Sequence, residues 1–156
     1  MRKKFFILLF LAVLWYPLSA QDKDQVQWLT WEQLSDSLTV HPKPVLLFFH
    51  TDWCAYCRKM QNVVFTDSAV IRKLDADYYA LRFDAESVDT VCFDHQILTN
   101  AVSKKRTGHY HQITKLLAAR EGKFTFPTTI VLRKDFTVRS RHFHYLDRRK
   151  LLKALQ

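Results

Sequence analysis

Two cysteines separated by two residues, Cys54 and Cys57, are the side chains of this 156-residue sequence best suited to covalent chemistry. They stand in the run Trp53-Cys54-Ala55-Tyr56-Cys57, directly after an apolar stretch and at the start of a helical pattern. A helix start presents unpaired N–H groups and the positive end of the helix dipole, which stabilise a thiolate on Cys54. Because the thiolate is the attacking species in disulfide exchange, we predict that Cys54 attacks and that Cys57 resolves the mixed disulfide.

Other roles of the same pair remain open from the residues alone. A structural disulfide persists in an oxidising compartment, but closing so short a loop removes little entropy from the unfolded chain. A zinc site needs further ligands at suitable spacing, and no second cysteine pair follows. Copper is suited by thiolates and imidazole, and His50 lies just before the motif. A metal-binding module that uses Cys54, Cys57 and His50 is therefore the competing hypothesis, and a non-catalytic interaction domain is the third.

The segments around the pair predict a strand followed by a helix. Residues 45–49 form an apolar run after Pro44 and before a polar turn. Their length and branching are typical of a strand buried on both faces of a parallel sheet. After Asp52, four residues recur at helical spacing on one face, namely Cys57, Met60, Gln61 and Val64. The pair is thus expected at the junction between a central strand and a helix.

The rest of the chain predicts further helices and strands. Thr30 and Gln33 match a capping box, which predicts a helix over residues 31–38. Asp67 is expected to cap a second helix that reaches Leu74, and Gly122 to stop a third. That third helix is predicted at 109–120. The remaining predicted elements are strands at 78–83, 128–132 and 136–143, a small hairpin at 91–98, and a helix at 146–155. This order predicts a mixed α/β domain with a layered core.

The first twenty residues have the layout of a secretory signal peptide. Positive residues at positions 2–4 precede an apolar run over 5–14, and small residues up to Ala20 offer a cleavage site. The apolar run is shorter than the ~20 residues that span a bilayer, which favours cleavage over an uncleaved membrane anchor. We therefore expect residues 1–20 to be removed and residues 21–156 to work in the periplasm or as a secreted protein.

Composition and charge exclude several classes of function. Hydrophobic residues make up 48% of the chain, which suits a folded protein, and two glycines are too few for a glycine-rich phosphate loop. The 24 Lys and Arg exceed the 15 Asp and Glu by nine. Removing residues 1–20 takes away three basic residues and no acidic one, which leaves 21 against 15 and a net charge of +6. The basic residues are spread out without a recognisable motif, so we expect no nucleic-acid partner.

The stretch from Lys43 to Met60 resembles the active-site strand, turn and helix of the thioredoxin superfamily. The later run Phe126-Pro127-Thr128-Thr129 is similar to the second motif of that family, and the likeness is strongest to exported bacterial thioredoxin-like proteins. It covers about residues 41–156. The resemblance implies a thioredoxin-like α/β fold over 21–156, with a central mixed sheet flanked by helices and an inserted element around 87–123.

The resemblance also implies roles for individual residues. Cys54 and Cys57 take the catalytic positions, and Pro127 takes that of a cis proline that faces the pair. Trp53, Phe126, Pro127 and Thr128 take the positions that contact substrate. We therefore expect exchange with protein thiols or disulfides, by a monomer that needs no dissociable cofactor, with a membrane electron donor as a further partner if it acts as a reductant.

The sequence departs from the family pattern at two places around the cysteines. Phe48 stands where thioredoxins carry a buried acidic residue, with Asp52 and His50 as candidates to replace that proton acceptor. Ala55-Tyr56 replaces the usual Gly-Pro between the cysteines, which leaves open whether the pair reduces or oxidises its partners. Cys92 makes the cysteine count odd, and we expect it to be buried as a small apolar residue. An intermolecular bridge and a third redox thiol are its alternative roles.

Overall fold

The computed structural model describes residues 25–93 and 95–156, so the expected signal peptide at 1–20 lies outside the described residues. Five strands form a central sheet in the order β1-β3-β2-β6-β7. β2 runs parallel to β3 and antiparallel to β6, β1 is parallel to β3, and β7 is antiparallel to β6, so the sheet is mixed. The strands are β1 (Trp28–Leu29), β2 (Val45–His50), β3 (Tyr79–Asp84), β6 (Thr128–Leu132) and β7 (Val138–His142).

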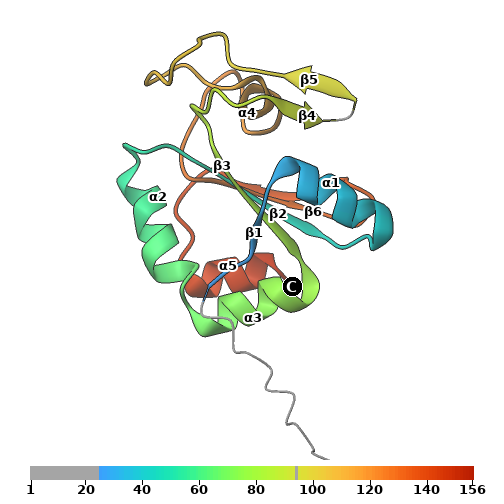
Figure 1. Ribbon diagram of the computed structural model, residues 1–156. Helices are drawn as coiled ribbons and strands as arrows, with labels where there is room; N and C mark the ends of the chain where they lie inside the picture. The colour runs from blue at the N-terminus through green and yellow to red at the C-terminus, as the bar shows by residue number, and fades with distance from the viewer. Residues whose placement is uncertain (1–24, 94) are drawn as a thin grey trace, which may run out of the picture.

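Helices cover both faces of the sheet (Figure 1). α1 (Trp31–Val40) packs on one face, while α2 (Ala55–Lys59), α3 (Ser68–Asp77) and α5 (Arg148–Ala154) pack on the other. Each face of the sheet has its own hydrophobic core. The strand β2 contributes side chains to both cores because successive side chains of a strand point to opposite faces. Leu46 and Phe48 belong to the core under α2, α3 and α5, whereas Val45, Leu47 and Phe49 belong to the core under α1.

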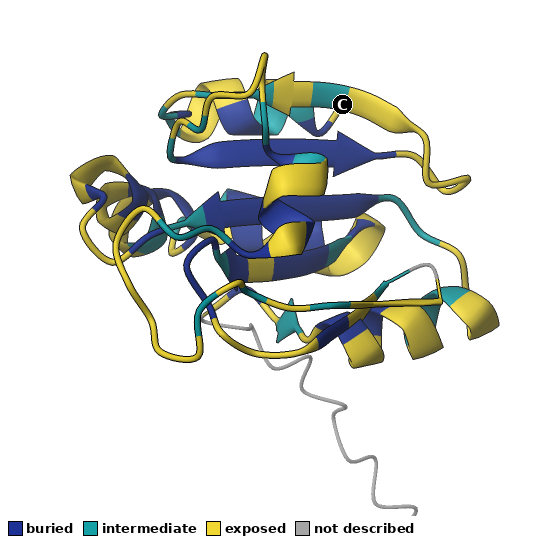
Figure 2. Cartoon of the chain, turned by 90° about the horizontal axis from the view of Figure 1, so that it is seen from above, coloured by how far each residue is buried: buried dark blue, intermediate teal, exposed yellow. Residues whose placement is uncertain are grey.

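Burial of β2 fixes the strand that leads into the cysteine motif. All five residues of Val45–Phe49 are at most 1% exposed, and Figure 2 shows the central strands dark blue between the outer layers. Burying one large apolar side chain stabilises the fold by about 1.5–3 kcal/mol. The mixed sheet with helices on both faces confirms the predicted fold class.

The predicted helix starts match the observed caps. Thr30 Oγ1 accepts the N–H of Gln33 at 3.2 Å, and Gln33 Oε1 accepts the N–H of Thr30 at 3.0 Å, which completes the capping box of α1. Asp67 Oδ1 accepts from the N–H groups of Ala69 and Val70 at the start of α3. Both helices run further than expected, to Val40 and Asp77.

The segment between β3 and β6 contains a hairpin and a short helix. β4 (Val91–Phe93) and β5 (Gln96–Leu98) pair antiparallel as predicted, and α4 (Gln112–Leu117) follows them. Figure 1 shows these elements together beyond one end of the central sheet. α4 is shorter than the predicted helix over 109–120, because the side chain of His111 caps it and a turn closed by Arg120 and Lys123 follows it. Gly122 has a φ of 73° within that turn and does not end the helix directly.

Two further differences concern the edge strands. β7 begins at Val138 rather than at 136, because Phe136 has a φ of 65° and the Asp135 carboxylate accepts the N–H of Thr137, which keeps these residues in a turn. β1 has only two residues, too few for a hydrophobic pattern to reveal it. Within residues 25–93 and 95–156, no helix combines the length and the apolar character needed to cross a membrane.

Candidate redox site

The two cysteines lie where β2 gives way to a helix. Cys54 is the N-cap of α2, and its sulfur accepts the backbone N–H of Cys57 at 3.1 Å. The Cys54 carbonyl accepts the N–H of Arg58 at 3.1 Å, which closes the first turn. α2 continues without a break into the π-helical turn η1 (Met60–Val64), so the positive end of a ten-residue helix lies at the first sulfur.

The cysteines form a disulfide in this structure, and their two sulfurs differ in accessibility. The S–S bond is 2.09 Å long and the Cα atoms are 5.2 Å apart. Cys54 is 5% exposed, whereas Cys57 is 0% exposed and belongs to the core under α2. The small exposed area of the pair therefore belongs to Cys54, and this is the side from which a reacting partner can approach.

Phe48 and His50 lie on the face of β2 that α2 covers. Phe48 is fully buried beside Phe65 and Trp28, and the imidazole of His50 stacks on its ring at a centroid distance of 5.9 Å. Burial lowers the pKa of His50 below 6.5, although the carboxylate of Asp84 on the neighbouring strand opposes that shift. His50 is therefore neutral at pH 7 and can accept a proton.

Asp52 is held in an ion pair on the surface of the motif. Its carboxylate pairs with Lys105, which also pairs with Asp84 at the end of β3. The hydrogen bond from Lys105 lowers the pKa of Asp52 from its ordinary value. A paired, exposed carboxylate of this kind remains charged at neutral pH and is a poor proton acceptor.

The loop before β6 lies next to the motif. The peptide bond between Phe126 and Pro127 is cis. Phe49 pairs with Thr128 across β2 and β6, which places Pro127 at the end of β2 from which the chain enters the cysteine motif. Pro127 and Thr128 are buried, and the ring of Phe126 meets that of Trp53 edge-on at a centroid distance of 6.2 Å.

Glu86 connects the motif to the inserted segment and is the main site residue that the sequence did not reveal. It is 2% exposed, and its Oε1 accepts the indole N–H of Trp53 at 3.0 Å and the backbone N–H of Gly108 at 2.6 Å. Burial, and then the charge of Glu86, raise the pKa of the Tyr110 phenol. One carboxylate thus faces three groups from two distant parts of the chain. A lone Glu after a strand carries no pattern that would have singled it out.

His111 fixes the base of the inserted segment. Its Nδ1 accepts the N–H of Ile113 at 3.1 Å, so its Nε2 carries the proton and donates it to the Asp89 carbonyl at 2.9 Å. Burial lowers the pKa of His111, and the backbone carbonyl of Asp89 opposes that shift. The imidazole is therefore a neutral, fully buried connector between α4 and the chain after β3.

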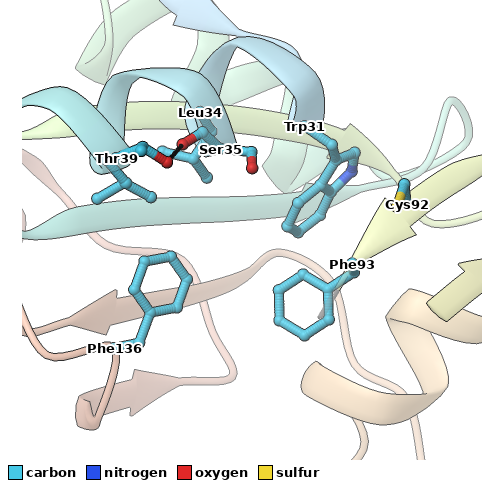
Figure 3. A pocket seen from close by; sticks show the side chains of 8 residues that line it. Trp31, Leu34, Ser35, Thr39, Cys92, Phe93 and Phe136 are labelled. Atoms are coloured by element: carbon cyan, nitrogen blue, oxygen red, sulfur yellow. Dashed lines mark hydrogen bonds between the residues drawn. The ribbon is translucent and has the colours of Figure 1, made fainter. Parts of the chain in front are cut away.

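Cys92 differs from the sequence-based expectation. It is an exposed free cysteine rather than a buried one, because its side chain points away from the core on the two-stranded hairpin while Val91 points inward. Cys92 lines a cavity of about 590 Å³ between α1 and the hairpin, together with Trp31, Phe93 and Phe136 (Figure 3). This cavity is formed by other elements than those that carry Cys54 and Cys57.

Among the residues that the structure describes, no three His, Cys, Asp or Glu side chains are placed so that they could hold a metal ion together. Cys54 and Cys57 are bonded to each other, and His50 stacks on Phe48. The copper alternative thus gains no supporting geometry from this part of the chain.

The sheet is mixed and five-stranded, and at the start of a helix two cysteines separated by two residues form a disulfide. These features define a thioredoxin-fold protein with a CxxC pair. A family model described as a thioredoxin-like domain matches residues 33–156, and the chain belongs to that family. No curated protein matches the sequence.

Solved structures share the fold at low sequence identity. An oxidoreductase described as DsbH is 21% identical, with a TM-score of 0.55, and the match covers 84% of this chain and 85% of that one. A thioredoxin from Thermus thermophilus is 19% identical, with a TM-score of 0.58 and the same coverage of 84% and 85%. The oxidised C-terminal domain of DsbD from Neisseria meningitidis is 19% identical, with a TM-score of 0.50 and coverage of 82% and 95%.

Proposed function

We propose that this chain is a thiol–disulfide oxidoreductase that exchanges disulfides with polypeptide substrates in an exported compartment. The observation that carries the proposal is a bonded cysteine pair at a helix start, in which Cys54 keeps 5% exposure and Cys57 is fully buried. A purely structural bridge needs no such asymmetry, whereas stepwise exchange needs one sulfur that partners can reach and one that they cannot.

In the reducing direction the reaction has two steps. The Cys54 thiolate attacks one sulfur of a substrate disulfide, forms a mixed disulfide, and releases the other substrate sulfur as a thiolate that takes up a proton. The Cys57 thiolate then attacks the Cys54 sulfur and releases the second substrate thiol. Two electrons pass to the substrate, and the Cys54–Cys57 disulfide of this structure is the product. The oxidising direction is the reverse.

The N–H of Cys57 and the helix dipole support the first step. Both favour negative charge on the Cys54 sulfur, which accepts that N–H at 3.1 Å. In the oxidising direction they also make Cys54 a good leaving group when the second substrate thiolate attacks the substrate sulfur of the mixed disulfide, because a stabilised thiolate leaves faster.

Trp53, Phe126, Pro127 and Thr128 are proposed to contact the substrate. Trp53 is 51% exposed and packs against Phe126. The two rings together form an apolar surface beside Cys54. Among the described residues, the backbone N–H and C=O of Phe126 bond to no other backbone group, so both are free to pair with an extended substrate.

His50 is proposed to take the proton of Cys57 in place of the acidic residue that Phe48 replaces. It lies on the face of β2 that α2 covers, and it is neutral at pH 7. Asp52 is less suited because Lys105 holds it as a charged carboxylate. In the variant His50→Gln, we expect the second step to slow and its pH profile to change while the first step keeps its rate.

Trapping of the intermediate tests the proposal. With a peptide that contains one disulfide, reduced Cys57→Ser is expected to accumulate a mixed disulfide of defined mass, and Cys54→Ser to form none. The variants are made in a Cys92→Ser background so that the exposed third thiol cannot contribute. Equal adduct formation by Cys54→Ser, or copper retained at one equivalent without exchange, would rule the proposal out.

Direction and compartment need separate measurements. A reduction potential near about −270 mV indicates a reductase, which needs an electron donor, and one near about −120 mV indicates an oxidant. Export is tested by the N-terminal sequence of the protein recovered from the producing cell, with Gln21 expected as its first residue.

A further inference from the structure

The part of the inserted segment that follows the hairpin, residues 99–123, concentrates positive charge, whereas Asp89 and Asp94 stand earlier in the insert. Residues 99–123 hold six Lys and Arg and one acidic residue, Glu121, a net charge of +5. Residues 21–98, which contain all three cysteines, hold seven basic and twelve acidic residues, a net charge of −5. The basic residues of the insert are Lys104, Lys105, Arg106, Lys115, Arg120 and Lys123.

Ion pairs hold the first basic group of the insert against the cysteine motif. Lys105 contacts the carboxylates of Asp52 in the motif and Asp84 at the end of β3, so its own charge is compensated. Lys104 and Arg106 adjoin it in the chain, with Cα atoms ~3.8 Å away, and both are exposed. Within residues 25–93 and 95–156 neither of these two side chains forms an ion pair, so both charges face solvent beside the motif.

Aromatic side chains connect the insert to Phe126 in the loop before β6. Tyr110 meets the ring of Phe126 at a centroid distance of 5.4 Å and that of Phe124 at 4.6 Å. Phe126 in turn contacts Trp53. The insert therefore adds an aromatic contact to Phe126, and next to Lys105 it carries two exposed positive charges that form no ion pair within the described residues.

We propose that residues 99–110 form a wall of the substrate site that selects polypeptides with acidic residues next to their cysteines. This inference rests on the proposed function and names its substrate class. Positive charge beside a site raises the association rate of partners with the opposite charge and slows those with the same charge, and salt weakens both effects. Association rates, rather than the chemistry on sulfur, should therefore depend on Lys104 and Arg106.

Three disulfides and two charge-reversed variants test the inference. Two peptides share one sequence with a single intramolecular disulfide, and carry either two Glu or two Lys beside the cysteines. The third disulfide is the small, uncharged hydroxyethyl disulfide. The test variant is Lys104→Glu/Arg106→Glu, with Lys104→Gln/Arg106→Gln as a milder second form.

The control variant makes the same charge change at the opposite end of the sheet, as Lys134→Glu/Lys153→Glu. β6 leads away from Pro127, so Lys134 lies about 20 Å further along the chain path at ~3.3 Å per residue. Lys153 lies in the last turn of α5, and Tyr78, the residue before β3, donates a hydrogen bond to the carbonyl of the nearby Leu155. Both lysines are exposed.

Single-turnover rates of the reduced protein are followed by tryptophan fluorescence at an ionic strength of about 0.01 M, where screening is weak. We expect wild type and control to react about tenfold faster with the acidic peptide than with the basic one. The test variant should reverse that preference, the Gln variant should abolish it, and hydroxyethyl disulfide should react alike with all. Equal peptide preference in test and control variants overturns the inference. No reaction with any of the three disulfides refutes the proposed function and the inference together.

Discussion

The contact between Glu86 and Trp53 allows a quantitative test of how the insert is attached to the redox site. A hydrogen bond to a charged group contributes about 1.5–3 kcal/mol, and Glu86 accepts two, from Trp53 and Gly108. Both donors can reach water once the carboxylate is gone, because Trp53 is 51% exposed and Gly108 is exposed. We therefore expect Glu86→Ala to lower the free energy of unfolding by about 2–3 kcal/mol rather than by the sum of two full contributions.

A double-mutant cycle isolates the indole contact. Trp53→Phe removes the N–H donor and keeps an aromatic ring against Phe126. Unfolding in urea, measured on the oxidised protein for Glu86→Ala, Trp53→Phe and the double variant, should give a coupling energy of about 1–2 kcal/mol. The matched control is a cycle of Glu32→Ala with Trp53→Phe, since Glu32 lies in the first turn of α1. A Glu86 coupling no larger than about 0.3–0.5 kcal/mol, the usual scatter of independent sites, would refute the reasoning.

Three further predictions concern groups around the site. Lys105→Met should destabilise the protein by no more than about 1 kcal/mol at pH 7, because Lys105 and Asp52 are 39% and 73% exposed. Pairing lowers the pKa of Asp52, so in urea titrations the part of the loss due to Asp52 should disappear as the pH falls through the folded-state pKa of that carboxylate. Burial lowers the pKa of His111, so its contribution is complete above about pH 6.5 and is lost as the pH falls through the folded-state value. In His111→Asn, the asparagine still caps α4, but the free energy of unfolding should fall less steeply between pH 7 and pH 5 than in the wild type. An unchanged slope would contradict a neutral imidazole at His111. A maleimide should label the oxidised native protein once, at Cys92, and Cys92→Ser should abolish labelling while changing stability by less than about 0.5 kcal/mol.

The fold followed from the sequence wherever local patterns were long or chemically specific. The buried run 45–49 and the capping residues Thr30 and Asp67 act over a few neighbouring positions, and each was confirmed. The ends of α4 and β7 depend on a histidine cap and on residues with positive φ, which hydrophobic periodicity does not encode. Cys92 was misplaced because a three-residue strand of a small hairpin has one exposed face, and three residues cannot show which face is buried.

The position of the cysteine pair was predictable from the sequence, but the surroundings of the pair were not. Cys54 and Cys57 could be placed at a helix start because their spacing and the preceding strand are local features. Glu86 could not, because its partners Trp53 and Gly108 are 33 and 22 residues away in the chain. Long-range contacts of single polar side chains depend on the tertiary fold and leave no periodic signal in the sequence.

Because the insert is attached to the cysteine motif at two points, a change of charge in the insert is expected to affect substrate association rather than the exchange step on the sulfurs. Lys105 is paired with carboxylates of the motif and of β3, and three residues later the N–H of Gly108 is bound by Glu86. A loop fixed at both points presents Arg106 as part of a wall rather than as a freely moving arm. Its charge then acts on the approach of a substrate, while the sulfurs keep their own surroundings of helix start and buried core. Reversing that charge should thus change association rates and leave the reduction potential of the cysteine pair as it is.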